Sequence, residues 1–189
     1  MNVTRSRYVV SAMDLGSLHA PHGSIHSVAK DALGERVALA IRASAGDTSV
    51  IWSGPKAITA EWTNGTHILI RFAMPDGAGG LALAGTESCP ATMLQYYCTG
   101  HGFEVQDSEG MWAPVTRVAV DIDERSISLE VSVESARRVR YAYSDWPLAM
   151  LRNRVGDLPA RLFDLEIANH RGWSTRGPQL ERPAQLRLQ

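Results

Sequence analysis

The 189-residue sequence predicts an α+β protein in which a strand and a helix, as found at the end of an α/β domain, precede an antiparallel β-sandwich. Two observations predict this fold class. A β-branched run and a helical hydrophobic pattern occupy the first part of the chain, and short β-prone segments separated by turn residues fill most of the rest. We therefore expect three parts: residues 1–46 with the strand, loop and helix, residues 47–168 with the β-sandwich, and a flexible tail over residues 169–189.

The first predicted element is a buried strand over residues 7–14, RYVVSAMD. Its last residue, Asp14, emerges at the carboxyl end of the strand, where site residues are often found. A strand that is apolar on both faces belongs in a parallel sheet with helices on both sides. One strand and one helix cannot cover such a strand, so we expect the front of the chain to be the end of a larger α/β domain.

The loop after this strand holds His19, His22 and His26 within eight positions. A proline and a glycine interrupt the loop, so the three rings need not share one helical face, and no fourth ligand accompanies them for a metal. The catalytic interpretation makes His26 a general base whose imidazole is oriented by Asp14, because imidazole titrates near neutral pH. The plain alternative is a polar loop histidine. On the residues alone, all three interpretations stay open.

A helix is predicted over residues 27–44, SVAKDALGERVALAIRAS, with Ser27 or Ser24 as its N-cap. Apolar residues such as Val37 and Ile41 recur at helical spacing and define the face expected to pack inward. His26 would then lie at the positive end of the helix dipole.

The remaining chain reads as β structure. Residues 57–74 predict a hairpin, with Asn64-Gly65 as a type I′ turn between its arms. Six further segments combine β-prone residues with flanking turn residues, namely 80–85, 92–98, 102–107, 116–123, 126–132 and 137–144.

The aromatic and basic segment 138–163 has two interpretations. It could form a sugar-stacking or nucleic-acid patch, or a last strand followed by a proline-braced strap that packs on the core. We favour the strap, because apolar residues dominate and arginine stems can cover apolar surface.

Composition limits the partners. The chain has 19 Lys and Arg against 20 Asp and Glu, which gives a formal net charge of −1. The overall charge therefore does not favour binding to nucleic acid or to an anionic membrane. No apolar run reaches the length of a membrane span, and the first residues do not resemble a signal peptide. Cys89 and Cys98 lie nine positions apart and could form a disulfide in an oxidising compartment.

Two groups of motifs, in this order, resemble a known family. The first is residues 13–43, MDLGSLHAPHGSIHSVAKDALGERVALAIRA, with an aspartate at the strand end, a GSIH segment and a GERVA helix. The second is VRYAYSDWP at 139–147 followed by LPARLF at 158–163. Together they are similar to the C-terminal part of sialate O-acetylesterases, which are carbohydrate esterases of the SGNH hydrolase group, over roughly residues 8–168.

This resemblance implies an SGNH-type α/β domain and hydrolysis of O-acetyl esters on sialic acids or related sugars. In such enzymes the matched histidine is the base of a Ser-His-Asp arrangement, which assigns that role to His26 and the orienting role to Asp14. It implies no metal or organic cofactor, an acetylated sugar or glycoconjugate as substrate, and a lysosomal or secreted location.

The nucleophile and oxyanion hole belong to a region of the family with no counterpart in these residues. We therefore expect the chain to be a C-terminal fragment that is inactive alone, with the N-terminal catalytic part as its partner. The alternative from a different class is a non-catalytic β-sandwich module that binds carbohydrate or another protein.

Overall fold

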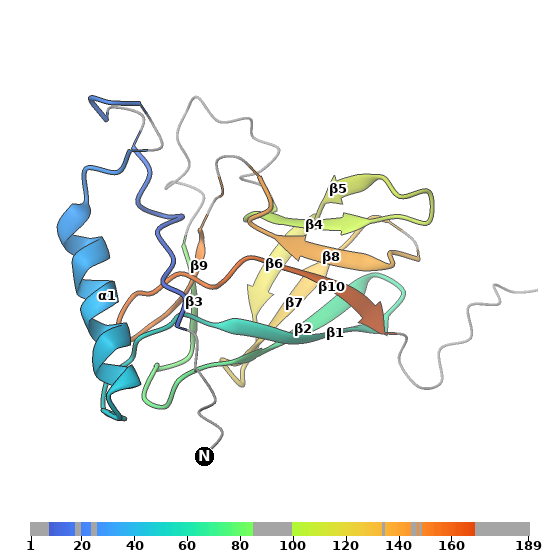
Figure 1. Ribbon diagram of the computed structural model, residues 1–189. Coiled ribbons are helices and arrows are strands. Elements are labelled where there is room, and N and C mark those ends of the chain that lie inside the picture. Colours follow the sequence, from blue (N-terminus) through green and yellow to red (C-terminus); the bar gives the residue numbers. More distant parts are fainter. Residues whose placement is uncertain are drawn as a thin grey trace, which may run out of the picture.

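The computed structural model describes residues 8–17, 20–23, 26–84, 100–133, 135–144, 147 and 149–168. These residues form one helix and ten strands (Figure 1). Their bounds are α1 (Lys30–Ser44), β1 (Lys56–Asn64), β2 (His67–Ala73), β3 (Leu81–Leu83), β4 (Phe103–Gln106), β5 (Trp112–Pro114), β6 (Arg117–Val120), β7 (Ser126–Glu130), β8 (Arg138–Tyr141), β9 (Leu151–Asn153) and β10 (Phe163–Ala168).

Eight strands form one curled sheet in the order β5-β4-β8-β10-β1-β2-β7-β6 (Figure 1). All neighbours in it are antiparallel except β1 and β10, which run parallel, with Ala60 opposite Ile167. The short strands β3 and β9 form a separate antiparallel pair. Alternate residues of the large sheet point into a common core, as period-two burial requires. Its fully buried members include Ile68, Ile70, Phe103, Val105, Ile127, Leu129, Val139 and Tyr141.

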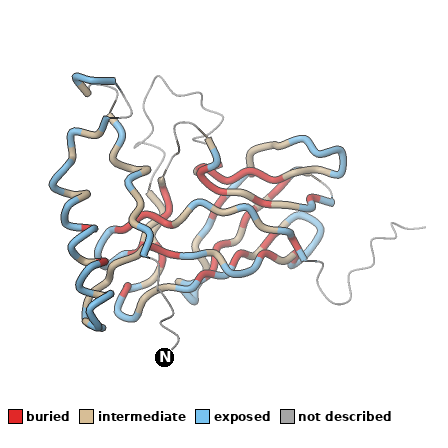
Figure 2. The backbone as a smooth tube through the Cα atoms, in the orientation of Figure 1, coloured by how far each residue is buried: buried red, intermediate tan, exposed pale blue. Residues whose placement is uncertain are grey.

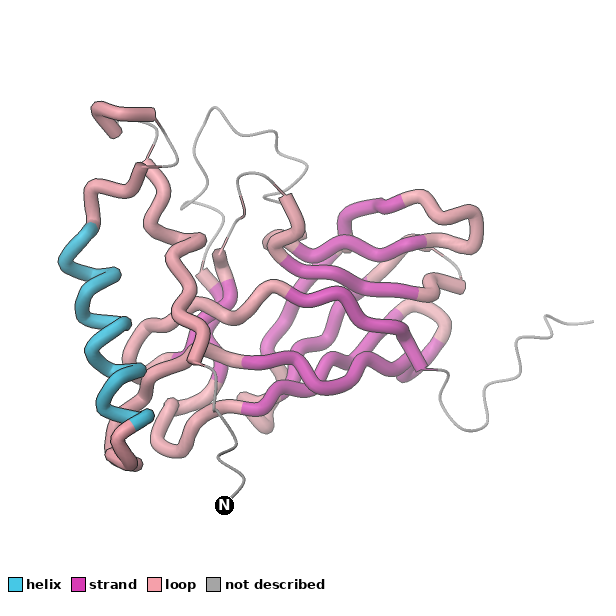
Figure 3. Tube along the Cα trace, viewed as in Figure 1, coloured by secondary structure: helices cyan, strands magenta, loops and turns pink. Residues whose placement is uncertain are grey.

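The predicted fold class is wrong in two respects. The described residues of the segment 7–14 form no strand: residues 8–14 are irregular, and Val9 is 63% exposed. Figure 3 shows this segment as loop beside α1, so the described residues contain no SGNH-type α/β unit with a terminal strand and helix. A run of β-branched residues forms a strand only where a neighbouring strand supplies hydrogen bonds, and none of the described strands pairs with this segment.

The second error concerns the β-sandwich. The strands do not divide into two packed antiparallel sheets, because β10 lies between β8 and β1 and joins the two halves into one mixed sheet. Nothing local in the segment 163–168 signals this insertion, since an alternating strand looks the same in sequence whichever neighbours it takes.

Helix α1 is confirmed, but it begins at Lys30 and its N-cap residue Ala29 makes no side-chain capping bond. Ser27 was one predicted cap, but its hydroxyl instead accepts a hydrogen bond from the Ala29 backbone N–H at 3.0 Å. The face that α1 buries is also not the predicted one: Arg36 and Ala40 are buried, whereas Val37 and Ile41 are exposed. Figure 2 shows most of the helix surface exposed to solvent. The described part of the chain contains no helix with the length and hydropathy needed to cross a membrane.

The predicted hairpin is confirmed as β1 and β2, with Asn64 opposite His67. The type I′ turn is wrong, because that turn needs positive φ at both central residues and neither Asn64 nor Gly65 has one. The Asn64 side-chain oxygen instead accepts a hydrogen bond from the Thr66 N–H at 2.9 Å and closes the turn. Strands also occur in the predicted segments 80–85, 102–107, 116–123, 126–132 and 137–144, whereas 92–98 lies outside the described residues.

Candidate functional site

Asp14 lies at the centre of a buried cluster with two arginines. Arg36 donates from Nη1 to Oδ1 of Asp14 at 2.6 Å and from Nη2 to Oδ2 at 2.7 Å, a bidentate pair. Arg152 donates from Nη2 to Oδ2 at 2.9 Å. The Asp14 side chain is only 4% exposed, and those of Arg36 and Arg152 are 10% and 22% exposed. We call these three residues the Asp14 cluster.

The Asp14 cluster ties together three segments that are distant in sequence. Arg36 projects from α1 and also donates to the Ser11 carbonyl oxygen at 2.9 Å. Arg152 comes from β9 and also donates to the Asp157 carbonyl oxygen at 2.9 Å. The cluster therefore holds the irregular segment before the histidine loop against both the helix and the two-stranded sheet.

Burial raises the pKa of Asp14, but the hydrogen bonds and charge of Arg36, with the charge of Arg152, outweigh burial and lower it below the usual 3.8. Asp14 in turn raises the pKa of Arg36. The carboxylate is therefore ionised at any pH near neutrality. A group so fixed neither gives nor takes a proton there, so its direct effect is to anchor and to compensate charge.

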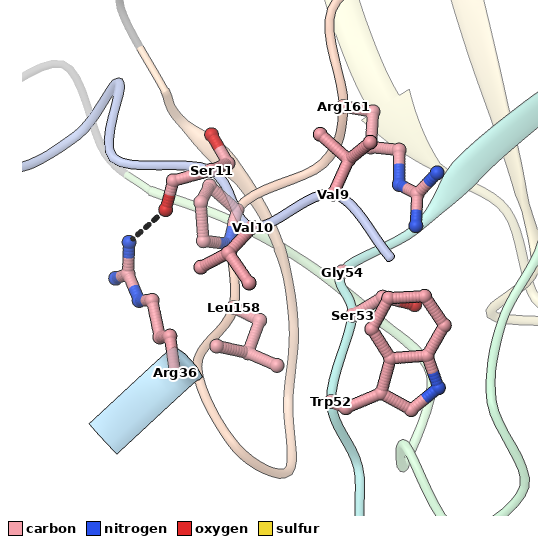
Figure 4. Close-up of a pocket in the computed structure, with 10 residues that line it drawn as sticks. Val9, Val10, Ser11, Arg36, Trp52, Ser53, Gly54, Leu158 and Arg161 are labelled. Atoms are coloured by element: carbon pink, nitrogen blue, oxygen red, sulfur yellow. Dashed lines mark hydrogen bonds between the residues drawn. The ribbon is translucent and has the colours of Figure 1, made fainter. Parts of the chain in front are cut away.

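A small pocket lies beside the cluster and shares Arg36 with it (Figure 4). Ser11, whose carbonyl oxygen accepts a hydrogen bond from Arg36, also lines the pocket. Its volume is about 20 Å³, which is room for about one water molecule and too little for a sugar ring. Trp52 forms part of the wall, with the Tyr8 ring centroid 4.8 Å from its own and the Arg161 guanidinium 5.5 Å from its ring. The pocket is a small gap between packed chain segments and has no room for substrate.

His26 lies four residues before α1, with an exposed side chain. Its backbone N–H donates to the Gly23 carbonyl oxygen at 2.9 Å. The side-chain hydrogen bonds that the structure gives Asp14 go to the two arginines and not to His26. The described geometry thus brings Asp14 together with Arg36 and Arg152, and leaves the imidazole of His26 facing solvent.

The other singled-out residues are only partly covered. His22 is exposed, His19 lies outside the described residues, and so do Cys89 and Cys98. Within the described ranges no three His, Cys, Asp or Glu side chains lie close enough to hold a metal ion.

Sequence reasoning missed both arginines of the cluster. Arg36 stood within the GERVA motif, but only as part of a helical pattern. Arg152 lies 138 positions from Asp14 and carries no local signal. A buried acid at the end of an apolar run does need a cationic partner, and that requirement was the available clue.

Comparison with known proteins finds a likeness in overall fold to a solved structure. No family model and no curated protein matches the chain. A solved structure does: the crystal structure of XAC1771, described as a novel carbohydrate acetylesterase from Xanthomonas citri. The TM-score is 0.60 and the sequence identity 26%, over 80% of this chain and 30% of that one.

The structural neighbour is a carbohydrate acetylesterase. This likeness supports a carbohydrate-esterase interpretation in broad terms, and does not single out the sialate O-acetylesterases. The chain spans about a third of the neighbour's length, so the activity of the longer protein enters only as a proposal.

Proposed function

We propose that this chain is the C-terminal part of a carbohydrate acetylesterase that hydrolyses O-acetyl esters on sialic acids or related sugars. The observation that carries the proposal is the likeness to XAC1771 over 80% of the chain. The sequence motifs around His26 and the LPARLF segment support the same class independently of the fold. The lysosomal or secreted location belongs to the proposal as well.

In this proposal His26 is the general base, and a serine outside these 189 residues is the nucleophile. His26 takes the serine proton as the oxygen attacks the acetyl carbonyl, then gives that proton to the departing sugar oxygen. It next takes a proton from water, which attacks the acetyl-enzyme. Acetate leaves, and the serine recovers its proton from the imidazolium.

Exposure of His26 in the described geometry is compatible with this role, because a base that serves a nucleophile from another region must present its imidazole outward. Asp14 was assigned the orienting role. Its carboxylate oxygens already accept hydrogen bonds from Arg36 and Arg152. We therefore propose that Asp14 orients His26 indirectly, by anchoring the start of the loop that leads to it.

The test is a fusion of this chain to the part of XAC1771 that lies outside the matched region. We expect the fusion to hydrolyse 4-nitrophenyl acetate and to release acetate from O-acetylated sugars, and the 189-residue chain alone to do neither. His26→Ala should remove most of the fusion's activity, on the order of 10³-fold or more, because proton transfer is lost.

His22→Ala is the matched control and should change turnover little, since it removes an exposed histidine from the same loop. A folded, monodisperse fusion without esterase activity contradicts the proposal. Turnover by the chain alone that disappears in His26→Ala also contradicts it, because the nucleophile would then lie within these residues.

A further inference from the structure

The turn between β1 and β2 presents an asparagine–glycine pair to solvent. Asn64 and Gly65 are both exposed, and the turn lies at the end of the sheet away from α1 (Figure 1). Asparagine amides are thermolabile, because the backbone nitrogen of the next residue can attack the side-chain carbonyl carbon. Glycine leaves this nitrogen unhindered, since it has no Cβ. The other asparagines, Asn2, Asn153 and Asn169, are followed by valine, arginine and histidine, so Asn64 has the least hindered neighbour.

Hydrogen-bond donors surround the side-chain oxygen of Asn64. Thr66 donates to Oδ1 from its backbone N–H at 2.9 Å and from its hydroxyl at 3.1 Å. The His67 Nδ1 atom lies 3.2 Å from the same oxygen. Attack on an amide carbon moves negative charge onto the amide oxygen, so donors already aimed at that oxygen stabilise the transition state. The contacts that close the turn therefore also lower the barrier to attack on Asn64.

The rest of the amide and the backbone beside it are loosely held. Among the described residues, every side-chain hydrogen bond of Asn64 involves Oδ1 and none involves Nδ2, so departure of this nitrogen breaks no contact. The pairing of β1 with β2 also has an irregularity between Trp62 and Asn64, which interrupts the ladder beside the turn. A segment with few backbone bonds opens at low cost. The Gly65 nitrogen can therefore reach the side-chain carbonyl carbon without disrupting the core of the sheet.

We propose that Asn64 is a site of spontaneous deamidation, at which the Gly65 backbone nitrogen closes a ring on the Asn64 side chain. The Gly65 nitrogen gives its proton to solvent and forms a bond to Asn64 Cγ, while the carbonyl electron pair moves to Oδ1. When the carbonyl forms again, the Cγ–Nδ2 bond breaks and the nitrogen leaves with a proton from water as ammonia. Water then opens the cyclic imide at either carbonyl carbon, which leaves aspartate or isoaspartate at position 64.

Either product changes the end of the hairpin. Both replace a neutral amide by a negative charge, and isoaspartate also runs the main chain through Cγ, which adds a carbon atom to the backbone. Because Asn64 lies opposite His67 across the turn, the extra atom displaces this pairing. The site is independent of the proposed esterase chemistry, since His26 precedes α1 at the other end of the molecule (Figure 1).

Peptide mapping by mass spectrometry tests the proposal after the folded 189-residue chain has stood for several weeks at neutral pH and physiological temperature. We expect the peptide that contains Asn64 to gain the mass of an amide-to-acid conversion. An isoaspartyl methyltransferase with labelled S-adenosylmethionine should label the same peptide. Asn153 is the internal control: it is 1% exposed, its Oδ1 accepts a hydrogen bond from the Leu158 N–H at 2.7 Å, and its peptide should keep its mass.

Gly65→Ala should slow the conversion by about tenfold or more, because the added Cβ hinders the attacking nitrogen. The variant keeps the turn, since φ of Gly65 is not positive. Thr66→Val removes the hydroxyl donor, keeps the backbone N–H and should slow the conversion by a few fold. Thr59→Val is its matched control, because it removes an exposed hydroxyl from β1 away from the turn and should leave the rate unchanged.

Circular dichroism of each variant shows that it is folded. The proposal is overturned by an Asn64 peptide that keeps its mass, by a folded Gly65→Ala chain that reacts as fast as the wild type, or by equal conversion of Asn153. A Thr66→Val rate equal to that of Thr59→Val would overturn the role assigned to the donors.

Discussion

Asp14→Asn is the most informative single substitution for the architecture around the histidine loop. It keeps the size of the side chain and removes its charge, so that the guanidinium groups of Arg36 and Arg152 lose their shared counterion. The amide nitrogen also places a donor where the carboxylate accepted three N–H···O bonds, at 2.6, 2.7 and 2.9 Å.

The size of the expected loss in stability follows from the burial of the ion pair. Removing one partner of a buried ion pair costs about 3 to 5 kcal/mol, because an uncompensated charge remains. Arg152 keeps its bond to the Asp157 carbonyl oxygen and is the more exposed arginine, so most of the cost falls on Arg36. We expect about 3 kcal/mol at pH 7, which at an m-value of about 2 kcal/mol/M lowers the urea midpoint by about 1.5 M.

The pH dependence has a defined sign. The folded-state pKa of Asp14 is lower than the unfolded value near 3.8, so on acidification the unfolded chain takes up this proton first. The contribution of Asp14 is complete above the unfolded pKa and is lost as the pH falls through the folded pKa. The stability difference between wild type and variant should therefore be constant from pH 7 to about pH 5 and shrink below pH 4.

Urea unfolding followed by tryptophan fluorescence, from pH 7 to the lowest pH with a folded baseline, measures both effects. Glu61→Gln is the matched control: it breaks an exposed 3.3 Å contact with Arg71 and should shift the midpoint little. A loss below 1 kcal/mol at pH 7, or a difference that stays the same in acid, would refute the assignment of Asp14 as a buried, doubly paired carboxylate.

Two further substitutions test the packing. Gly54→Ala should destabilise the fold by about 2 kcal/mol or more in thermal unfolding, because a Cβ there would lie 2.0 Å from the Pro159 carbonyl oxygen. Gly34→Ala is the contrasting case, because its Cβ would meet nothing within 4 Å on an exposed helix face. This substitution should be neutral or stabilise the fold by up to about 1 kcal/mol. Tyr141→Phe should cost about 1 to 3 kcal/mol in urea unfolding, because the buried Leu151 N–H that donates to the Tyr141 hydroxyl at 2.8 Å loses its acceptor; an unchanged midpoint would mean that this N–H finds another partner.

Local patterns predicted the elements that depend on local contacts. The alternation in the segments around Ile68 and Ile127 identified β2 and β7, and the turn residues at Asn64 identified the hairpin. The helical spacing also located α1. In the strands and the hairpin, the residues that make the signal are the residues that make the contact. In α1 the spacing located the helix, although Val37 and Ile41, which belong to the pattern, are exposed.

The errors concern contacts between distant segments. Residues 8–14 have the composition of a buried strand, yet strand formation depends on a neighbour that their own sequence does not contain. The Asp14 cluster depends on Arg152 from β9, and the Arg140 guanidinium on β8 lies 4.0 Å from the ring centroid of Trp112 on β5. Pairings of this kind are fixed by topology, so a single sequence indicates only that a buried acid or an exposed ring needs some partner.

The position of β10 has a consequence for how the chain folds. This last described strand lies between β8 and β1, and its pairing with β1 joins Ala60 to Ile167. The two halves of the sheet therefore cannot be joined until the end of the strand has left the ribosome, and closing so long a loop makes the step slow. Until then β1 and β8 expose unpaired edges, so we expect nascent or truncated chains that lack residues 163–168 to aggregate more readily than chains that contain them.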